Sequence, residues 1–357
     1  MYYPDQRPLS SYTVIQRDVM LPDEASGTLR TTEGHRVDIR DVVAQGIVSN
    51  GYVIIEAAQF FGLRNPERLE RLMQVNVGDI IKKQDVLAGK NARRGKRLFS
   101  PVRGVVAQVS NGRIMLQAAP TIVDLEAGVR GKVMAIYEGR GVTVESIGAR
   151  VQGFWGNNRN TIASLRLGPE GEFTDEFGDT LDRRYTGSIV LLRKPLTRGA
   201  LDLVTEQGFA GIIAPSMDAR LRPMALELNT AILLTEGFGK LRMSTTVFNL
   251  LQTFDGSQVT LDATMPNRWQ PRRPEIVINV PSKDRTPSRP NPRLKLDSGM
   301  EVRLKRDPNM GTTGNIVDLP ESPILLDNGL RVMAAQVQLV TGETMFVPLA
   351  NLEVLGR

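Results

Sequence analysis

Glycine is the feature that most limits what this 357-residue chain can fold into, because 33 glycines cut much of it into short apolar runs. Two stretches, residues 75–118 and 298–355, consist almost entirely of such runs, separated by turn pairs such as Asn328-Gly329. Short alternating runs between turn residues are typical of β-strands in small sheets. At about 100–200 residues per domain, the length allows two to four units. The sequence therefore predicts a β-rich protein made of several small domains.

The middle of the chain follows a different pattern. The runs SIVLLRKPL, GFAGIIAP and TAILLTEGFG are continuously apolar, which is typical of strands covered on both faces. The segments between them, RGALDLVTEQ and SMDARLRPMALELN, have helical spacing. Alternating strands and helices predict an α/β domain with a parallel sheet.

These patterns predict an α+β, multidomain chain with a β-rich beginning, a central α/β domain and a C-terminal β-barrel. Asn65-Pro66-Glu67 favours a short helix within the first part. The predicted parts are an N-terminal β-rich segment at 1–74, a β domain at 75–169, the α/β domain at 185–280, a proline- and arginine-rich linker at 281–296 and the barrel at 297–357.

A duplicated hairpin is predicted within the second part. Val102-Arg103-Gly104 through Gly112-Arg113 has the same spacing as Val129-Arg130-Gly131 through Gly139-Arg140. Two such hairpins are expected to pack together, because a lone hairpin buries too little apolar surface to be stable.

The composition limits which metal sites and catalytic sites the chain can form. The chain has no cysteine and one histidine, His35, so thiolate and histidine metal sites and histidine-based triads lose their usual donors. We therefore expect no metal site, no cofactor and no catalytic residues. The first residues lack a basic end followed by an apolar run, and no run reaches the roughly 18 apolar residues of a membrane span, so we expect a cytoplasmic protein without membrane insertion.

Residues 75–118 resemble the barrel-sandwich hybrid of biotinyl and lipoyl carrier domains, on the phrases VGDIIKKQDVLA and SPVRGVVAQV. The resemblance implies a hairpin that carries a modified lysine. Counting back from Ser100-Pro101 places Arg93 at that position, with Lys90 and Lys96 nearby. It therefore implies a carrier-like fold without the attachment lysine.

Residues 298–355 resemble an SH3-like barrel of the KOW type, on GMEVRLKRDPNMGTTGNIVDL and FVPLANLEVL. Barrels of this type bind RNA, polymerase or other proteins, and some only pack against a neighbouring domain. The middle unit is more loosely similar to swivelling β/α domains, around GFAGIIAPSM. The whole order of domains resembles a bacterial multidomain family that we connect to no activity.

An anion site is predicted at the turn Thr235-Glu236-Gly237-Phe238-Gly239, which follows an apolar run and precedes a helical one. Open α/β sheets present backbone N–H groups to ligands at such turns. Lys240 and Arg242 are expected to assist, and Ser216 is expected to border the same edge. The alternative is that the glycines only form a tight turn, with Glu236 solvated or paired.

Nucleic acid or a protein partner is predicted to contact a basic hairpin and two tryptophans. The cations Arg93, Arg94, Lys96, Arg97 and Arg103 have no carboxylate among them, which favours phosphate contacts. Trp155 lies between glycines and is expected to expose its ring, whereas Trp269, beside several arginines, is expected either to stack on a base or to seal a domain interface.

Three functions follow as hypotheses. The first is a non-enzymatic, modular binding or scaffold protein that contacts nucleic acid or a protein complex. The second is a small-anion sensor or enzyme that uses the Thr235–Gly239 turn. The third is a carrier-like accessory subunit without an attached cofactor.

Overall fold

The computed structural model describes the chain except for residues 1–4, 8, 24, 90–94, 169–182, 267–271, 282–285, 292, 307–308, 327 and 356–357, and the side chain at 205. It contains 47% strand and 13% helix, which confirms the predicted β-rich class. The chain divides into unit 1 (residues 1–17, 128–132 and 145–357) and unit 2 (residues 18–127 and 133–144). Within the described residues, we find no helix with the length and apolar character that crossing a bilayer requires.

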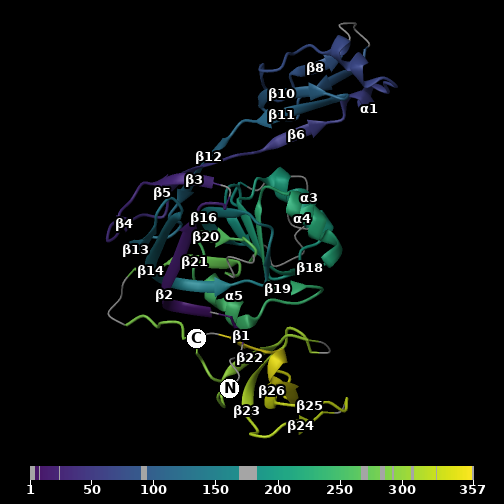
Figure 1. Cartoon of the computed structure of the whole chain (residues 1–357). Helices are drawn as coiled ribbons and strands as arrows, with labels where there is room; N and C mark the ends of the chain where they lie inside the picture. Colours follow the sequence, from purple (N-terminus) through teal and green to yellow (C-terminus); the bar gives the residue numbers. More distant parts are fainter. Residues whose placement is uncertain are drawn as a thin grey trace. The chain divides into compact units, whose positions relative to one another are not determined.

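Unit 1 is built around a sheet with strand order β15-β19-β18-β17-β16-β20-β21-β14 (Figure 1). The strands are β14 (Gly141–Gln152), β15 (Trp155–Gly156), β16 (Asn160–Leu167), β17 (Ile189–Leu191), β18 (Gly211–Met217), β19 (Ala231–Phe238), β20 (Gln258–Asp262) and β21 (Glu275–Asn279). Strands β16, β17, β18 and β19 are parallel neighbours, which confirms the predicted parallel sheet.

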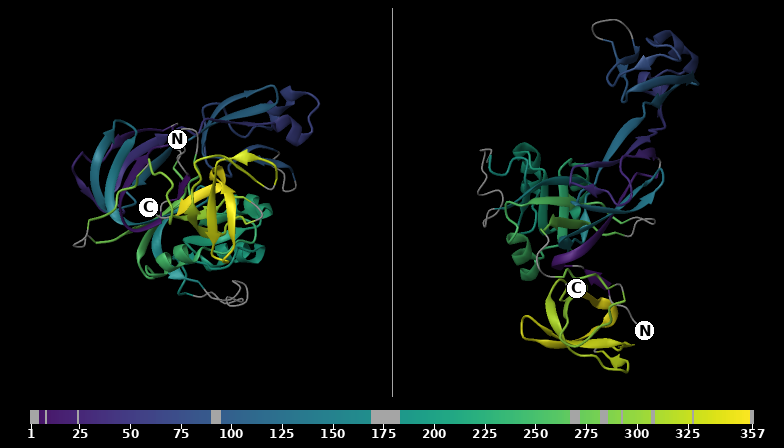
Figure 2. Two further views of the ribbon diagram at one scale, coloured as in Figure 1. Left: turned by 90° about the horizontal axis from the view of Figure 1, so that it is seen from below. Right: turned by 90° about the vertical axis from the view of Figure 1, so that its left-hand side faces the viewer.

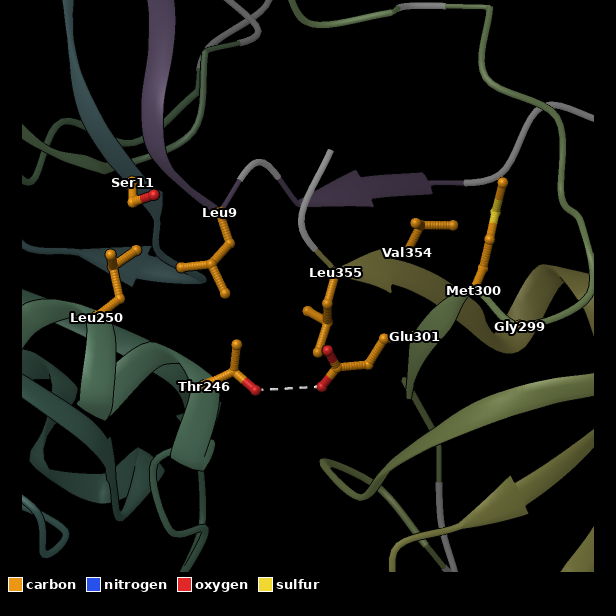
Figure 3. A pocket seen from close by; sticks show the side chains of 9 residues that line it. All are labelled: Leu9, Ser11, Thr246, Leu250, Gly299, Met300, Glu301, Val354 and Leu355. Carbon is orange, nitrogen blue, oxygen red and sulfur yellow. Dashed lines mark hydrogen bonds between the residues drawn. The ribbon is translucent and has the colours of Figure 1, made fainter. Parts of the chain in front are cut away.

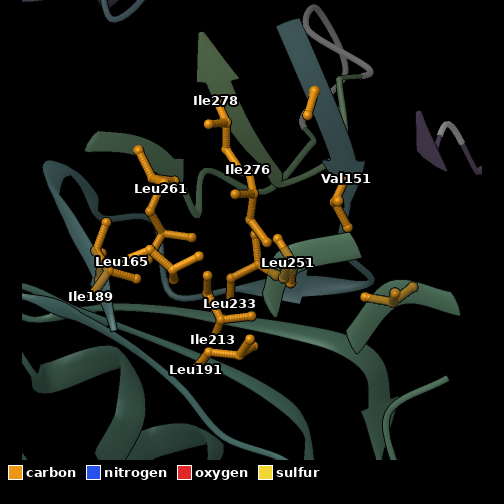
Figure 4. Close-up of a cluster of buried hydrophobic side chains, with 14 of the residues drawn as sticks. Val151, Leu165, Ile189, Leu191, Ile213, Leu233, Leu251, Leu261, Ile276 and Ile278 are labelled. Atoms are coloured by element: carbon orange, nitrogen blue, oxygen red, sulfur yellow. The ribbon is translucent and has the colours of Figure 1, made fainter. Parts of the chain in front are cut away.

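Helices cover both faces of this sheet. They are α3 (Arg198–Gln207), α4 (Arg222–Glu227), α5 (Thr245–Gln252) and the short 3-10 helix η2 (Ala219–Leu221). Helices α3 and α4 pack on the face that carries Ile212 and Ile232, whereas α5 packs on the face that carries Ile213 and Leu233 (Figure 4). Adjacent residues of one strand thus enter different cores, which explains the continuous apolar runs.

A second sheet of unit 1, with order β1-β28-β22-β23-β26-β27, curls around its own apolar core (Figure 2, right). Its elements are β1 (Asp5–Arg7), β22 (Glu301–Leu304), β23 (Thr313–Asp318), β26 (Ala334–Leu339), β27 (Thr344–Pro348) and β28 (Leu352–Leu355), with the ribbon β24 (Ile324–Leu325) and β25 (Arg331–Val332) and the turn η3 (Leu349–Asn351). Strand β1 pairs in parallel with β28, although the sequence had placed it in a separate N-terminal part.

The predicted linker also takes part in pairing. Ser288 forms a parallel bridge with Thr13 of β2 (Leu9–Met20), and its carbonyl accepts a hydrogen bond from the Val14 N–H at 2.9 Å. Part of the proline-rich segment therefore lies against a strand.

Unit 2 contains three further sheets, of order β6-β11-β10-β7, β12-β5-β3 and β8-β9. The elements are β3 (Ala25–Leu29), β4 (Arg36–Val37), β5 (Val42–Val48), β6 (Tyr52–Ile55), β7 (Ile80–Ile81), β8 (Val86–Gly89), β9 (Arg97–Phe99), β10 (Gly104–Ser110), β11 (Arg113–Ala118), β12 (Thr121–Glu126), β13 (Gly131–Tyr137), α1 (Ala57–Phe61) and η1 (Pro66–Leu72). Strand β6 pairs with β11 and β5 pairs with β12, so pairing does not follow the predicted boundary at residue 75.

Two local predictions can be compared with these elements. The helix expected after Asn65 is the 3-10 helix η1, and the Asn65 side chain accepts from the Glu67 N–H at 2.9 Å. The two repeats correspond to the β10–β11 hairpin and to the consecutive strands β13 and β14, but these belong to different sheets. They therefore do not pack together as one duplicated sheet.

The turn between β10 and β11 requires a glycine. Asn111 and Gly112 both have positive φ angles, +50° and +76°, as type I′ hairpin turns require. A Cβ atom on Gly112 would lie 2.5 Å from the Ala58 Cβ atom.

We expect Gly112→Ala to destabilise the hairpin by more than about 1 kcal/mol, from backbone strain and from this clash. Hydrogen exchange of the β10 and β11 amides measures the loss. Gly62→Ala is the matched control, because Gly62 has a φ of +67° and open space around it. Equal losses in both variants would show that the contact with Ala58 contributes nothing.

Candidate anion-binding cleft

A cleft of about 1130 Å³ lies where three parallel strands of unit 1 end. Its walls come from the segments that follow β17 (residues 192–198), β18 (218–221) and β19 (239–245), together with Phe248. Parallel strands end at one edge of their sheet, and open α/β sheets bind ligands outside this edge.

The order in which the chain adds strands to the sheet reverses at the same place. From β17 to β19, each new strand lies further from β16, and after α5 the chain returns to β20 on the other side of β16. Helices α3 and α5 begin beside the cleft and pack on opposite faces of the sheet. Such a reversal is where open α/β sheets form a crevice.

The lining of the cleft is strongly basic. Its six cations follow the ends of the strands, and they are Arg193, Lys194, Arg198, Arg220, Lys240 and Arg242. Asp218 is the one acid in this lining, which leaves a local charge of +5. All six cations are exposed.

Most of these cations are not neutralised by neighbours. Arg220 lies 3.5 Å from Asp218 (Nε to Oδ1), and the Arg193 guanidinium lies over the Phe248 ring at 4.3 Å. No carboxylate of the described residues lies within ion-pair distance of the other four cations. An incoming anion therefore has to displace few existing ion pairs.

Two helix N-termini add to the positive potential. Thr197 caps α3, because its Oγ1 atom accepts from the Ala200 N–H at 3.2 Å. At α5 the Ser244 N–H donates to Glu236 Oε1 at 3.2 Å, and the Ser244 side chain makes no capping bond. Helix N-termini carry a partial positive charge, which favours anions.

The sequence-predicted anion site overlaps this cleft in part. Gly239 and Lys240 line it, together with Arg242. Thr235, Glu236 and Ser216 are buried, so their predicted role as ligand contacts in this cleft is not supported by their placement. The Cβ position of Gly237 lies 2.9 Å from the Phe154 ring, so this glycine permits a close approach between side chain and backbone rather than between ligand and backbone.

Ser216 instead fixes the cleft wall. Its hydroxyl accepts from the Leu241 N–H at 3.0 Å and lies 2.9 Å from the carbonyl oxygens of Gly239 and Leu241, to one of which it donates. The segment that carries Lys240 is thus held against the end of β18. Sequence reasoning missed Arg193, Lys194, Arg198 and Arg220, although each follows an apolar run in the same way as Lys240 does.

Glu236 belongs to a buried ion cluster. Its Oε2 atom accepts from Arg303 Nη1 of β22, and Arg303 Nη2 donates to the Glu236 carbonyl at 3.3 Å. Arg7 of β1 donates to the Thr235 carbonyl. The carboxylate is thus paired, as the alternative interpretation of this turn had it.

The residues that were predicted to contact nucleic acid or a partner protein lie in different parts of the chain. Trp155 is 3% exposed and packs edge-on against Phe238 at 5.6 Å, so the expectation of an exposed ring was wrong. Lys96, Arg97 and Arg103 are exposed in unit 2, as a phosphate-contacting surface would require. Arg93, Arg94 and Trp269 lie outside the described residues.

A smaller cavity of about 390 Å³ has a different character. Its lining includes the apolar side chains of Leu9, Leu250 and Leu355, and Thr246 of α5 donates to Glu301 of β22 at 3.2 Å (Figure 3). Its one charged lining residue is an acid, so it does not attract anions.

Nowhere in the described residues do three or more histidine, aspartate or glutamate side chains lie close enough together to hold a metal ion. No protein-family model matches the chain, and the curated proteins include no significant match.

Proposed function

We propose that this chain binds a small ligand with several phosphate groups in the strand-end cleft of unit 1. The observation that carries the proposal is the cluster of six cations against one acid at the ends of β17, β18 and β19. The ends of three parallel strands and the first turns of two helices meet there, which is the arrangement that binds phosphates in many α/β domains.

The number and type of charges favour phosphates over a simple carboxylate. A local charge of +5 is far more than one carboxylate needs, whereas a di- or triphosphate carries several negative charges within a few ångströms. Four of the six cations are arginines, whose guanidinium groups form two parallel hydrogen bonds with phosphate oxygens. The volume slightly exceeds the range of about 300–1000 Å³ typical of ligand pockets, which leaves room for an organic group.

Titration calorimetry with inorganic tripolyphosphate and inorganic phosphate tests the proposal. We expect tripolyphosphate to bind at least tenfold more tightly than phosphate, and binding to weaken between 50 and 200 mM salt because exposed charges are screened. The variant Lys240→Gln/Arg242→Gln is expected to bind tripolyphosphate at least tenfold more weakly.

Arg331→Gln is the control, because Arg331 is an exposed arginine of β25 outside the cleft lining. Equal affinity of the double variant and the wild type would contradict the proposal, as would the absence of tripolyphosphate binding. A single-stranded oligonucleotide that binds through the same residues, in place of tripolyphosphate, would make the ligand a nucleic acid.

A second proposal concerns the β domains. We propose that residues 75–118 form a barrel-sandwich hybrid and residues 298–355 an SH3-like barrel, and that these modules contact nucleic acid or a partner protein. Support comes from their sequence phrases, from the curled C-terminal sheet and from the exposed Lys96, Arg97 and Arg103. Neutralising these three cations tests it, since salt-sensitive association with RNA or DNA should then fall.

A further inference from the structure

A separate cavity of unit 1, about 510 Å³ in volume, lies beside the buried ion cluster. It is lined by residues of β1, of the turn between β14 and β15, of the segment before β21, of β22 with the turn after it, and of β28. None of its lining residues belongs to the strand-end cleft. It is therefore a second cavity of unit 1 with several charged side chains in its wall.

Cations outnumber carboxylates in this cavity. The five cations in its wall are Arg7, Arg273, Arg303, Lys305 and Arg306, and the two carboxylates are Asp5 and Glu353. Glu236, behind the wall, is paired with Arg303. With this third carboxylate counted, the cluster keeps a net charge of +2.

Three of the four carboxylate oxygens of Asp5 and Glu353 accept hydrogen bonds. Both Asp5 oxygens accept from Arg273 Nη2 at 2.7 Å, and Oδ2 also accepts from Lys305 at 3.2 Å. Glu353 Oε1 accepts from Arg273 Nη1 at 2.6 Å. Glu353 Oε2 lies 3.1 Å from Arg7 Nη2, without hydrogen-bond geometry. Glu353 Oε2 therefore makes no hydrogen bond, although it also lies 3.7 Å from the Nε atom of Arg303.

Two buried donors are left over. Arg7 is 3% exposed and Arg303 is 1% exposed, and the Nε atom of each makes no hydrogen bond with the described residues. Arg303 Nε has only an ion-pair contact with Glu353 Oε2, at 3.7 Å, whereas Arg7 Nε has no such contact in this part of the chain. Buried polar groups normally have partners, and a buried arginine donor without one is costly. Exposed Arg306, at the rim, has no ion-pair partner in the described part of the chain.

The electrostatic setting of Arg7 agrees with an excess of positive charge. Burial, together with the charges of Arg303 and Arg273, lowers the pKa of Arg7 to about 10, although Glu353 and Glu236 oppose the change. A bound anion would act in the same direction as the two glutamates.

Apolar residues complete the wall. Phe154, Pro266 and Met310 line the cavity beside the cations, and Phe154 is 41% exposed. Such a wall can contact the organic part of a ligand while the arginines hold its charged group.

We propose that this cavity binds a phosphate monoester, with the phosphate on the arginine cluster and the organic group against Phe154, Pro266 and Met310. A phosphate monoester carries a charge of about −1.5 to −2 at neutral pH, which matches the +2 of the cluster. Arginine is also the side chain best suited to contact phosphate oxygens in pairs.

Calorimetry with phenyl phosphate and inorganic phosphate on the full chain tests this proposal. We expect phenyl phosphate to bind at least tenfold more tightly than inorganic phosphate, because only phenyl phosphate contacts the apolar wall. Arg306→Gln is expected to weaken phenyl phosphate binding at least fivefold without affecting folding, since Arg306 is exposed. Lys240→Gln/Arg242→Gln and Arg331→Gln are expected to leave it unchanged.

Three results would overturn the proposal. One is no phenyl phosphate binding at millimolar concentration, and another is binding that Arg306→Gln does not alter. The third is binding that depends on Lys240 and Arg242 instead, which would place phenyl phosphate in the strand-end cleft. Failure here leaves the tripolyphosphate experiment intact, because the two experiments change different residues.

Discussion

Replacing Arg303 with methionine is expected to lower the free energy of unfolding of unit 1 by about 3–5 kcal/mol, the usual cost of removing one partner of a buried ion pair. Arg303 is 1% exposed and contacts the buried Glu236 carboxylate of the parallel sheet. Methionine fills a similar volume but leaves Glu236 with a less compensated charge. Urea denaturation followed by tryptophan fluorescence measures the loss, because Trp155 is buried in unit 1.

Two further variants identify the cause. Arg331→Met changes an exposed arginine and is expected to stay within about 0.5 kcal/mol of the wild type. Arg303→Met/Glu236→Gln removes both charges and is expected to be more stable than Arg303→Met alone, because the buried carboxylate that lost its main partner is then neutral. A loss below about 1 kcal/mol in Arg303→Met, or a double variant less stable than the single one, would refute this explanation.

Replacing Asp262 with asparagine is expected to cost about 3 kcal/mol at pH 7, since it also removes one partner from a buried ion network. Asp262 Oδ2 lies 2.9 Å from both Arg17 Nη2 and Arg272 Nη2, and Oδ1 accepts from the Thr264 N–H at 3.1 Å. Glu275 pairs with Arg17 at 3.4 Å in the same network. Asparagine keeps the shape of the side chain and removes its charge.

The loss of stability in Asp262→Asn is expected to depend on pH. Burial acts to raise the pKa of Asp262, but the charges of Arg17 and Arg272 and the hydrogen bonds from Thr264 outweigh it and hold the pKa below its ordinary value of 3.8. A carboxylate with a lowered pKa in the folded state contributes stability above its unfolded pKa, and this contribution disappears as pH falls through the folded pKa.

Urea denaturation of both proteins at a series of pH values checks this dependence. We expect the difference in unfolding free energy between the wild type and Asp262→Asn to be constant from pH 7 to about 5 and to shrink below about pH 4. A difference that is unchanged at the lowest pH at which both proteins fold would show that the charge of Asp262 is not its source.

The parallel sheet could be predicted because its cause is local. Ile212 and Ile213 are adjacent and enter different cores. A strand that is buried on both faces therefore has a continuous apolar run, which can be recognised in the sequence. The edge that holds the cleft follows from the same pattern, since Lys240 comes directly after a buried strand. The other cations of the cleft meet Lys240 only because three strands end together.

The buried ion cluster could not be predicted, because its partners are distant in the sequence. Glu236 looks like a turn residue until β22 brings Arg303 against it. Strand β1 has only three residues, too few for an alternating pattern, and its partner β28 is near the other end of the chain. In unit 2, β6 was assigned to a separate part because nothing in four residues shows that it pairs with β11.

The pairing of β1 with β28 also constrains the order in which the chain can fold during synthesis. Asp5 lies opposite Glu353 and Arg7 opposite Leu355, so the ribosome makes β1 long before its neighbour. Until β28 emerges, Arg7 lacks Glu353 and the edge of β1 has no strand to join. Bringing such distant segments together requires closing a very long loop, which slows folding. The parallel sheet has all of its strands earlier, so we expect it to form first and the C-terminal sheet to close last.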